Sequence, residues 1–167
     1  NWYRMNDIED ENGQLLLTQK IYCALEDDQG MLWVGTADGV ARSADLGLSW
    51  EIIRRVNADY RDPLEISAYP NPFSPSRMNQ LYDDGYVRIH CHVPSAGNLD
   101  IDVYDFGMTR VRKIADRMEV NVQDIEVTWN GKNGMNQVVA NGVYFIRLTF
   151  HDGTQDHVAW SKIIILD

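Results

Sequence analysis

The stretch GYVRIHCHV, residues 85–93, decides the fold. Its apolar residues Val87, Ile89, Cys91 and Val93 alternate with Arg88, His90 and His92. Successive side chains of a β-strand point to opposite faces, so this period of two predicts a strand with one apolar face and one wet face. Such a strand belongs to an antiparallel sheet that covers a core on one side.

Similar stretches on both sides of it extend the pattern. Strands are predicted at 65–69, 85–93, 98–104, 110–115, 124–129, 142–150 and 156–166. The third of these repeats the alternation, with Leu99, Ile101 and Val103 on one face. Helical periodicity is nearly absent, and a series of about seven short strands is typical of an immunoglobulin-like β-sandwich. The chain is therefore predicted to be all-β.

The residues before this series predict a second, smaller sheet. Short apolar runs at 21–25, 31–36, 40–43 and 50–53 are separated by turns that contain Gly30, Gly39 and Gly47. Strands joined by such turns form an antiparallel four-stranded meander, and residues 2–20 offer one or two further strands. We expect this sheet at residues 1–56, a linker at 57–64 that ends in a proline-containing stretch, and the sandwich at 65–167.

Charge and hydropathy exclude two classes of partner. The chain has 15 basic and 25 acidic residues, a formal net charge of −10, and so would be repelled by nucleic acid. Its one basic cluster, at 110–117, lies among acidic residues. No apolar run is long enough to cross a bilayer. Because the chain begins Asn1-Trp2-Tyr3 without an initiator Met, we expect a piece of a longer, exported protein.

The two cysteines predict neither a disulfide nor a metal site. Cys23 and Cys91 lie far apart, and each stands in a strand-like apolar run, so we expect two buried free thiols. His90 and His92 flank Cys91, but they point to the opposite face of the strand. The three side chains cannot easily close on one metal, and no metal or cofactor is predicted.

Two motifs in the first sheet resemble those of propeller blades. One is Asp28-x-Gly30-x-Leu32-Trp33-x-Gly35-Thr36, which resembles the repeat of two-component-regulator propellers. The other is Ser43-x-Asp45-x-Gly47-x-x-Trp50, which is similar to the Asp-box of sialidase-type propellers. Asp45 can bond the backbone of its own turn, Gly47 can take a positive φ and Trp50 can pack between strands. We therefore interpret the box as a folding device and not as a catalytic site.

Four motifs in the second region resemble the FlgD-like immunoglobulin domain. They are Tyr69-Pro70-Asn71-Pro72-Phe73, Val103-Tyr104-Asp105-x-Gly107, Trp129-Asn130-Gly131 followed by Asn141-Gly142-Val143-Tyr144, and Ser161-Lys162-Ile163-Ile164-Ile165. The two Asn-Gly pairs are interpreted as turn dipeptides, because both residue types tolerate positive φ. Flagellar hook-capping proteins and the C-terminal sorting domains of type IX secretion cargo share this fold.

What the resemblance implies is a sorting or anchoring role at the bacterial surface, with secretion machinery or a surface glycolipid as partner. Two alternatives stay open: a structural or adhesive protein that self-associates through β-edges, and the scaffold end of a propeller hydrolase whose active site lies upstream. Within this sequence no nucleophile, phosphate loop or carboxylate pair stands out. We therefore expect no enzymatic activity from residues 1–167.

Overall fold

The computed structural model describes residues 7–11, 13–54, 63–81, 84–121 and 124–167. These residues form strands and turns but no helix, which confirms the all-β prediction. The chain divides into two compact units, residues 1–59 with 79–82 and residues 60–78 with 83–167. Most of the predicted linker, 57–64, lies outside the described residues, so its position stays a prediction.

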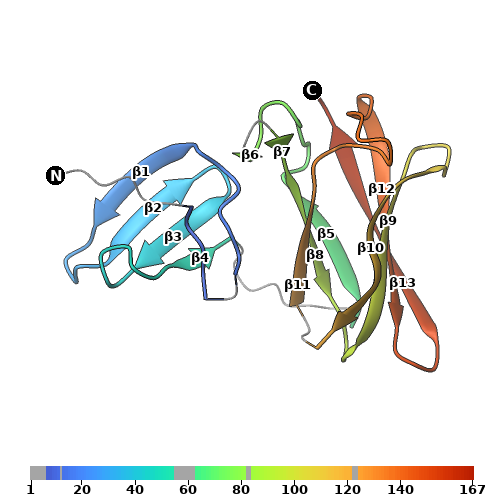
Figure 1. Ribbon diagram of the computed structural model, residues 1–167, viewed down its shortest axis with the longest axis horizontal. Helices are drawn as coiled ribbons and strands as arrows, with labels where there is room; N and C mark the ends of the chain where they lie inside the picture. The colour runs from blue at the N-terminus through green and yellow to red at the C-terminus, as the bar shows by residue number, and fades with distance from the viewer. Residues whose placement is uncertain (1–6, 12, 55–62, 82–83, 122–123) are drawn as a thin grey trace. The chain divides into compact units, whose positions relative to one another are not determined.

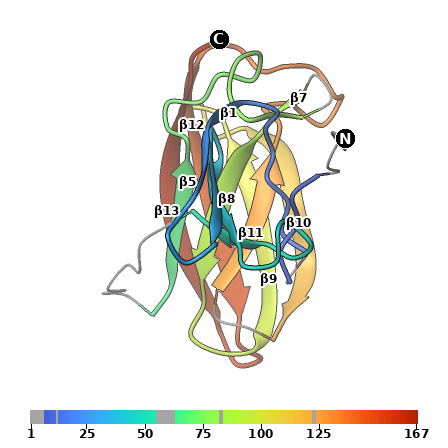
Figure 2. The same ribbon diagram turned by 90° about the vertical axis from the view of Figure 1, so that its left-hand side faces the viewer.

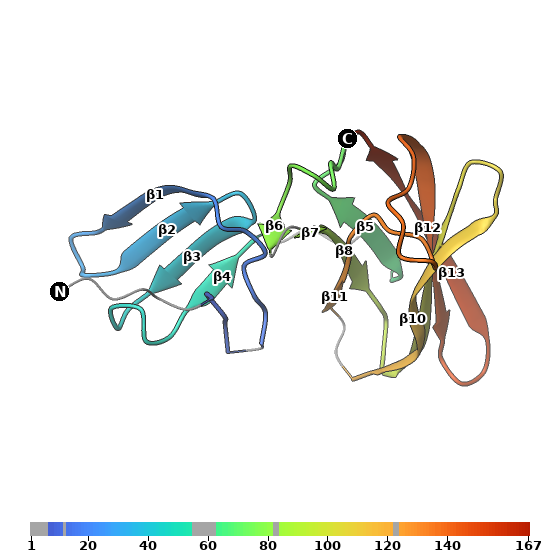
Figure 3. The same ribbon diagram turned by 45° about the horizontal axis from the view of Figure 1, so that its top comes forward.

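The first unit is built on the predicted four-stranded meander. Its strands are β1 (Ile21–Glu26), β2 (Leu32–Thr36), β3 (Gly39–Ser43) and β4 (Glu51–Ile53). They lie side by side in chain order, each antiparallel to the next (Figure 3). One face buries a small core of Leu16, Val34, Ala41 and Trp50. Each strand pairs with its sequence neighbour, as in the blade of a β-propeller.

The described residues before β1 contribute bridges instead of the extra strands that were expected. Glu9 pairs with Leu15, and Asp10 pairs with Trp50 beside β4. A buried ion pair fastens this segment: Arg54 lies 3.5 Å from the Asp38 carboxylate, which also accepts a 2.8 Å hydrogen bond from the N–H of Leu17. The segment therefore packs on one face of the sheet through Leu16 and meets its edge only at the bridge from Asp10 to Trp50.

The second unit is a sandwich of two antiparallel sheets, which Figure 1 shows as separate layers. One sheet has the order β11-β8-β5 and the other β10-β9-β12-β13. The bounds are β5 (Glu65–Tyr69), β8 (Val87–His92), β9 (Gly97–Tyr104), β10 (Arg110–Val120), β11 (Asp124–Trp129), β12 (Gly142–His151) and β13 (Asp156–Ile165). All seven predicted strands are present. Two short strands, β6 (Gln80–Leu81) and β7 (Asp84–Gly85), lie between β5 and β8 in the chain, and β7 belongs to this unit.

Alternation places the sandwich core as predicted. One alternating set of apolar residues in β8, β9 and β12 faces inward and is fully buried; it includes Val87, Ile89, Cys91, Leu99, Ile101, Val103, Ile146, Leu148 and Phe150. Burial stabilises the unit by roughly 1.5–3 kcal/mol for each large apolar side chain in this core. No helix of the described residues has the length and hydropathy of a membrane-spanning segment.

Two expectations about exposure were wrong. The outer face of β8, which was expected to be exposed to solvent, is partly buried. Arg88 is 2% exposed, and its guanidinium lies 2.7 Å from the Glu126 carboxylate of β11. His90 and His92 are also half-buried, near Asp124.

Cys23 is exposed, because β1 is the outermost strand of its sheet and all six of its residues are exposed. Cys91 is buried, and burial raises the pKa of its thiol to about 12.

Candidate functional site

The segment after β5 crosses from one sheet of the sandwich to the other. β5 pairs with β8, whereas Phe73 forms a parallel bridge with Ile165 of β13. The N–H of Phe73 donates to the Ile164 carbonyl at 2.8 Å, and the N–H of Leu166 donates to the Phe73 carbonyl at 2.9 Å. The peptide bonds before Pro70 and Pro72 are cis. Residues 70–73 thus lie alongside β13 at the edge of its sheet. The Phe73 side chain is fully buried.

Side chains add to this pairing. The amide of Asn71 donates from Nδ2 to the Lys162 carbonyl at 2.8 Å and accepts at Oδ1 from the N–H of Ile164 at 3.0 Å. Asp167 Oδ1 accepts from the Ser76 hydroxyl, from the Ser76 N–H at 2.9 Å and from the Ser74 hydroxyl at 2.8 Å. These bonds, that of the Ser76 hydroxyl above all, lower the pKa of Asp167. Residues 70–76 and 162–167 therefore form one connected structure.

The Trp129 and Tyr144 motifs pack at the same end of the sandwich. The Trp129 ring is 2% exposed, meets the Tyr144 ring edge to face at 6.0 Å, and donates from Nε1 to the Lys132 carbonyl at 2.9 Å. The Tyr144 hydroxyl donates to the Ala140 carbonyl at 2.8 Å. Gly131 has φ of 70°, and a Cβ there would lie 2.7 Å from Cγ of Pro75. We call this end, made by residues 70–76, 129–145 and 162–167, the motif end.

Gly142 does not have the predicted turn role. Its φ is not positive; it begins β12, and an added Cβ would meet nothing within 4 Å. In the loop before it, Gly131 and Asn136 have positive φ, of 70° and 61°. Asn141 instead bonds the backbone of Asp167, accepting from its N–H at 2.8 Å and donating to its carbonyl at 3.2 Å. The Asn-Gly pair is thus one more contact between the motif segments.

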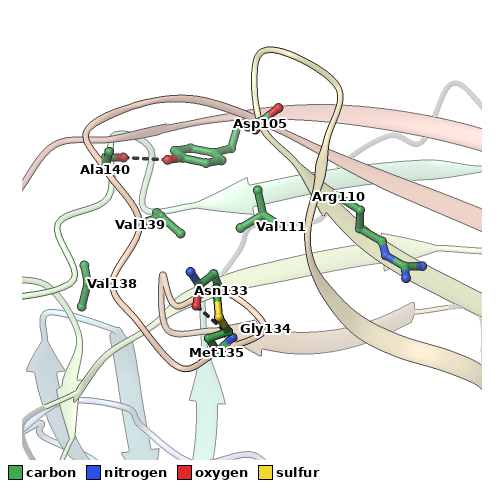
Figure 4. Close-up of a pocket in the computed structure, with 10 residues that line it drawn as sticks. Asp105, Arg110, Val111, Asn133, Gly134, Met135, Val138, Val139 and Ala140 are labelled. Carbon is green, nitrogen blue, oxygen red and sulfur yellow. Dashed lines mark hydrogen bonds between the residues drawn. The ribbon is translucent and has the colours of Figure 1, made fainter.

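An open pocket of about 480 Å³ lies at the motif end. Its wall on one side is the end of the β9–β10 hairpin, with Asp105, Arg110 and Val111, and on the other the segment 133–140 (Figure 4). Val111, Val139 and Tyr144 give it an apolar lining, while Met135 and Val138 are 77% and 52% exposed at its rim. Asp105, Arg110 and Asn133 add polar groups to this lining, so the pocket is of mixed polar and apolar character.

The hydrogen bonds of the first blade turn centre on Asp27, which the motif had not singled out. Its Oδ1 accepts from the N–H groups of Gln29 and Met31, both at 2.9 Å, and its Oδ2 accepts from Nε1 of Trp33 at 2.9 Å. The bond from Trp33 is the largest cause of the lowered pKa of Asp27. Asp28 is exposed and has no side-chain hydrogen bond to the described residues. Gly30 has φ of 79°, and Gly35 leaves space for Cys23, whose Sγ would lie 2.7 Å from a Cβ there.

The Ser-x-Asp-x-Gly-x-x-Trp turn is held by its own side chains. Asp45 accepts from the hydroxyl and N–H of Ser49, at 2.6 and 2.8 Å, and from the Ser43 hydroxyl at 2.7 Å. These bonds, that of the Ser49 hydroxyl first, lower the pKa of Asp45 to about 2. Gly47 has φ of 92°, and Trp50 is 7% exposed in the small core. The side-chain hydrogen bonds of Ser43, Asp45 and Ser49 all stay within the turn.

The outer strand of the blade leaves apolar side chains uncovered. Ile21, Tyr22 and Leu25 of β1 are 63%, 71% and 52% exposed, and Val40 of β3 is 38% exposed. Exposed apolar side chains gathered on an edge strand are a candidate interaction surface. The sequence could have predicted this, because the run Ile21–Leu25 is apolar on both faces.

A cluster of charged groups lies at the other end of the sandwich. His151 lies between two carboxylates, with Nε2 at 2.8 Å from Asp100 and Nδ1 at 2.5 Å from Asp156. Asp100 and then Asp156 raise the pKa of His151. Burial opposes ionisation of Asp100, but bonds from His151, the Arg117 N–H and Lys113 hold its pKa well below the usual range.

Within the described residues no group of three or more metal-ligating side chains occurs, and none of these clusters includes an activated nucleophile.

The geometry defines a class: a propeller-type blade followed by an immunoglobulin-like sandwich whose motif segments meet at one end. Residues 15–38, which include β1 and β2, match the Two component regulator propeller family. A search of curated proteins by sequence gives no match.

Solved structures similar to the chain include three bacterial proteins. FlgD of P. aeruginosa is 16% identical over 47% of this chain, with a TM-score of 0.42. Dimeric latent PorU of Porphyromonas gingivalis is 16% identical over 81% of the chain, with a TM-score of 0.48. PorZ of the same organism, described as an essential surface component of the type-IX secretion system, is 12% identical over 96% of the chain, with a TM-score of 0.38.

The chain spans 60%, 12% and 32% of the lengths of these three structures, respectively. With such identities and TM-scores below 0.5, none of them indicates what this chain binds.

Proposed function

We propose that the chain is a non-catalytic module of an exported bacterial protein, in which the sandwich serves secretion sorting or cell-surface anchoring. One observation carries the proposal. Motifs separated by up to 93 residues in the chain fold into a single rigid surface, the motif end. A recognition module needs a surface of fixed shape, and side-chain bonds from Asn71, Asp167 and Asn141 supply that rigidity.

The blade supports the second part of the proposal, that this module ends a β-propeller. A single blade exposes apolar side chains that a neighbouring blade would cover, and β1 carries three of them. The match of residues 15–38 to a propeller family agrees with this role. The turn around Asp45 uses its polar atoms internally, which supports a structural and not a catalytic role for the box.

The test is an export assay in a bacterium that has a type IX pathway. The protein containing this module should reach the surface, and removal of residues 63–167 should leave it inside the cell. Val138→Asp, which puts a charge on the exposed rim of the motif end, should reduce export. Gln155→Asp adds the same charge at the β12–β13 turn and should not. Normal export of the truncated protein would overturn the proposal.

The absence of catalysis is tested separately. Purified residues 1–167 should not turn over glycoside, ester or peptide substrates. Robust turnover by this fragment, abolished by Asp45→Ala, would contradict the structural role given to the box.

A further inference from the structure

The first half of β13, residues 156–160, is a sheet edge with unpaired backbone groups. β13 and β10 are the two outer strands of the four-stranded sheet, as Figure 2 shows. In the second half of β13, residues 161–165, the backbone groups of Lys162 and Ile164 point away from β12 and bond Asn71 and Phe73. Residues two apart on a strand direct these groups the same way, so those of Val158 and Trp160 also point outward. Among the described residues none forms a backbone hydrogen bond with Val158 or Trp160, although β5 lies near β13.

This edge lacks two of the features that prevent strand pairing, a β-bulge and a proline. β10 has three register shifts along its pairing with β9, whereas β13 pairs with β12 over ten residues without one. β13 contains no proline, and its outward-facing Val158 and Trp160 are each 46% exposed. A regular, partly apolar edge with unpaired N–H and C=O groups is a template for another strand.

The sequence of the edge is complementary to itself. The outer face carries, in order, Asp156, Val158, Trp160 and Lys162. If two copies pair antiparallel about Ala159, Val158 lies opposite Trp160 of the second copy and their outward backbone groups bond each other. The side chains of Asp156 and Lys162 lie opposite each other at the two ends of this pairing, where the Lys162 carbonyl stays bonded to Asn71. Opposite charges and apolar side chains then meet at directly facing positions, which is the favourable arrangement. Both charged side chains are accessible, since Asp156 is 64% exposed beside His151 and Lys162 is exposed.

We propose that a second copy of this chain docks on β13, in antiparallel register about Ala159, and joins two four-stranded sheets into one. The interface is isologous and obeys two-fold symmetry, so it closes at a dimer. This proposal does not depend on the sorting function: a monomeric chain can still be a sorting module, and a dimer need not be.

Cysteine cross-linking tests the register in the whole chain. In a Cys23→Ser background, Ala159→Cys places two thiols at a facing pair that makes no hydrogen bonds across the new interface, where Cα atoms lie about 4.5 Å apart, within disulfide range. Mild oxidation should link this variant into a dimer. Ser161→Cys is the matched control on the same face of β13, and it should not link because position 157 of the partner lies opposite it.

Light scattering over a wide concentration range gives the second readout. Lys162→Glu should weaken self-association by roughly tenfold, because it sets two like charges opposite each other twice in the dimer. Asp156→Lys should do the same, and the double variant should recover association. Glu119→Lys on β10 alters charge away from the edge and should have no effect.

The proposal is overturned by a sharp monomer at all concentrations. It is also overturned if Ser161→Cys links as fast as Ala159→Cys, or if Leu25→Asp on the blade abolishes association while Lys162→Glu leaves it intact.

Discussion

The side-chain Oδ1 of Asn71 accepts a 3.0 Å hydrogen bond from the backbone N–H of Ile164, 93 residues further along the chain. With the bond from Nδ2 to the Lys162 carbonyl, one amide occupies two groups on the edge of β13. Asn71 therefore acts as a short additional strand where the proline on either side of it leaves no backbone N–H to donate.

Asn71→Ala should destabilise the sandwich by about 1 kcal/mol, because this is the usual net contribution of an intramolecular hydrogen bond to stability. Hydrogen exchange should locate the effect, since the Ile164 amide loses its acceptor and should exchange faster. Asn98→Ala, at an exposed asparagine of β9, is the control and should change neither. Unaltered protection of Ile164 in Asn71→Ala would argue against this role.

Two glycines give a matched pair for backbone strain. Gly131→Ala should destabilise by about 2 kcal/mol or more, because its φ of 70° disfavours a side chain and the new Cβ would lie 2.7 Å from Pro75. Gly142→Ala meets no neighbour and has no positive φ, so it should be neutral or stabilise by up to about 1 kcal/mol. Urea midpoints of the two variants are the measurement; a larger loss for Gly142→Ala would refute the assignment.

The His151 cluster should make stability depend on pH. Asp100 and Asp156 raise the pKa of His151 above its ordinary value of 6.5. The stabilisation is therefore complete below pH 6.5 and is lost as pH rises through the folded-state pKa. Urea unfolding at a series of pH values should show this decline in the native protein and a smaller one in His151→Gln. Asp156→Asn should move the NMR titration of His151 to lower pH; no movement would contradict the pairing.

Acid should act on the same cluster with the opposite sign. The pKa of Asp100 is held below its ordinary value of 3.8, so its contribution is present above pH 3.8 and is lost as pH falls through the folded-state pKa. Asp100→Asn should therefore flatten the acid limb of the stability curve. An acid limb identical to that of the native protein would show that other carboxylates govern it.

The two thiols should differ in reactivity. Cys23 is exposed on β1, whereas Cys91 is buried and has a pKa of about 12. A thiol reagent such as DTNB should modify one cysteine per native chain and two after unfolding. Cys23→Ser should remove the fast phase, and modification of both thiols at one rate would be the contrary result.

Much of the fold followed from local pattern. Alternation in 85–93 and 98–104 identified the inward faces of two strands, and the glycine-containing turns identified the blade meander. The errors concern partners that are distant in the chain. Arg88 is buried because Glu126 of another strand pairs with it, and Cys23 is exposed because β1 ends its sheet. The alternation of apolar and polar residues predicts neither the strand that supplies Glu126 nor the position of β1 at the edge of its sheet.

The site was harder to predict for the same reason. Each motif was visible, but their meeting at one end depends on bonds such as that from Asn141 to Asp167, which no local rule encodes. The choice of Asp28 over Asp27 failed for a smaller reason. Two adjacent carboxylates have the same chemistry, and only the direction of the turn decides which of them reaches Trp33.

The parallel pairing of residues 71–73 with 163–166 has a mechanical consequence. A force that separates residue 64 from residue 167 pulls these two segments past each other along their length. The bonds from Phe73 to Ile164, from Leu166 to Phe73 and from Asn71 to Ile164 are then loaded together, in shear, and must break at the same time. This joint would resist tension far better than a hairpin that opens one bond after another.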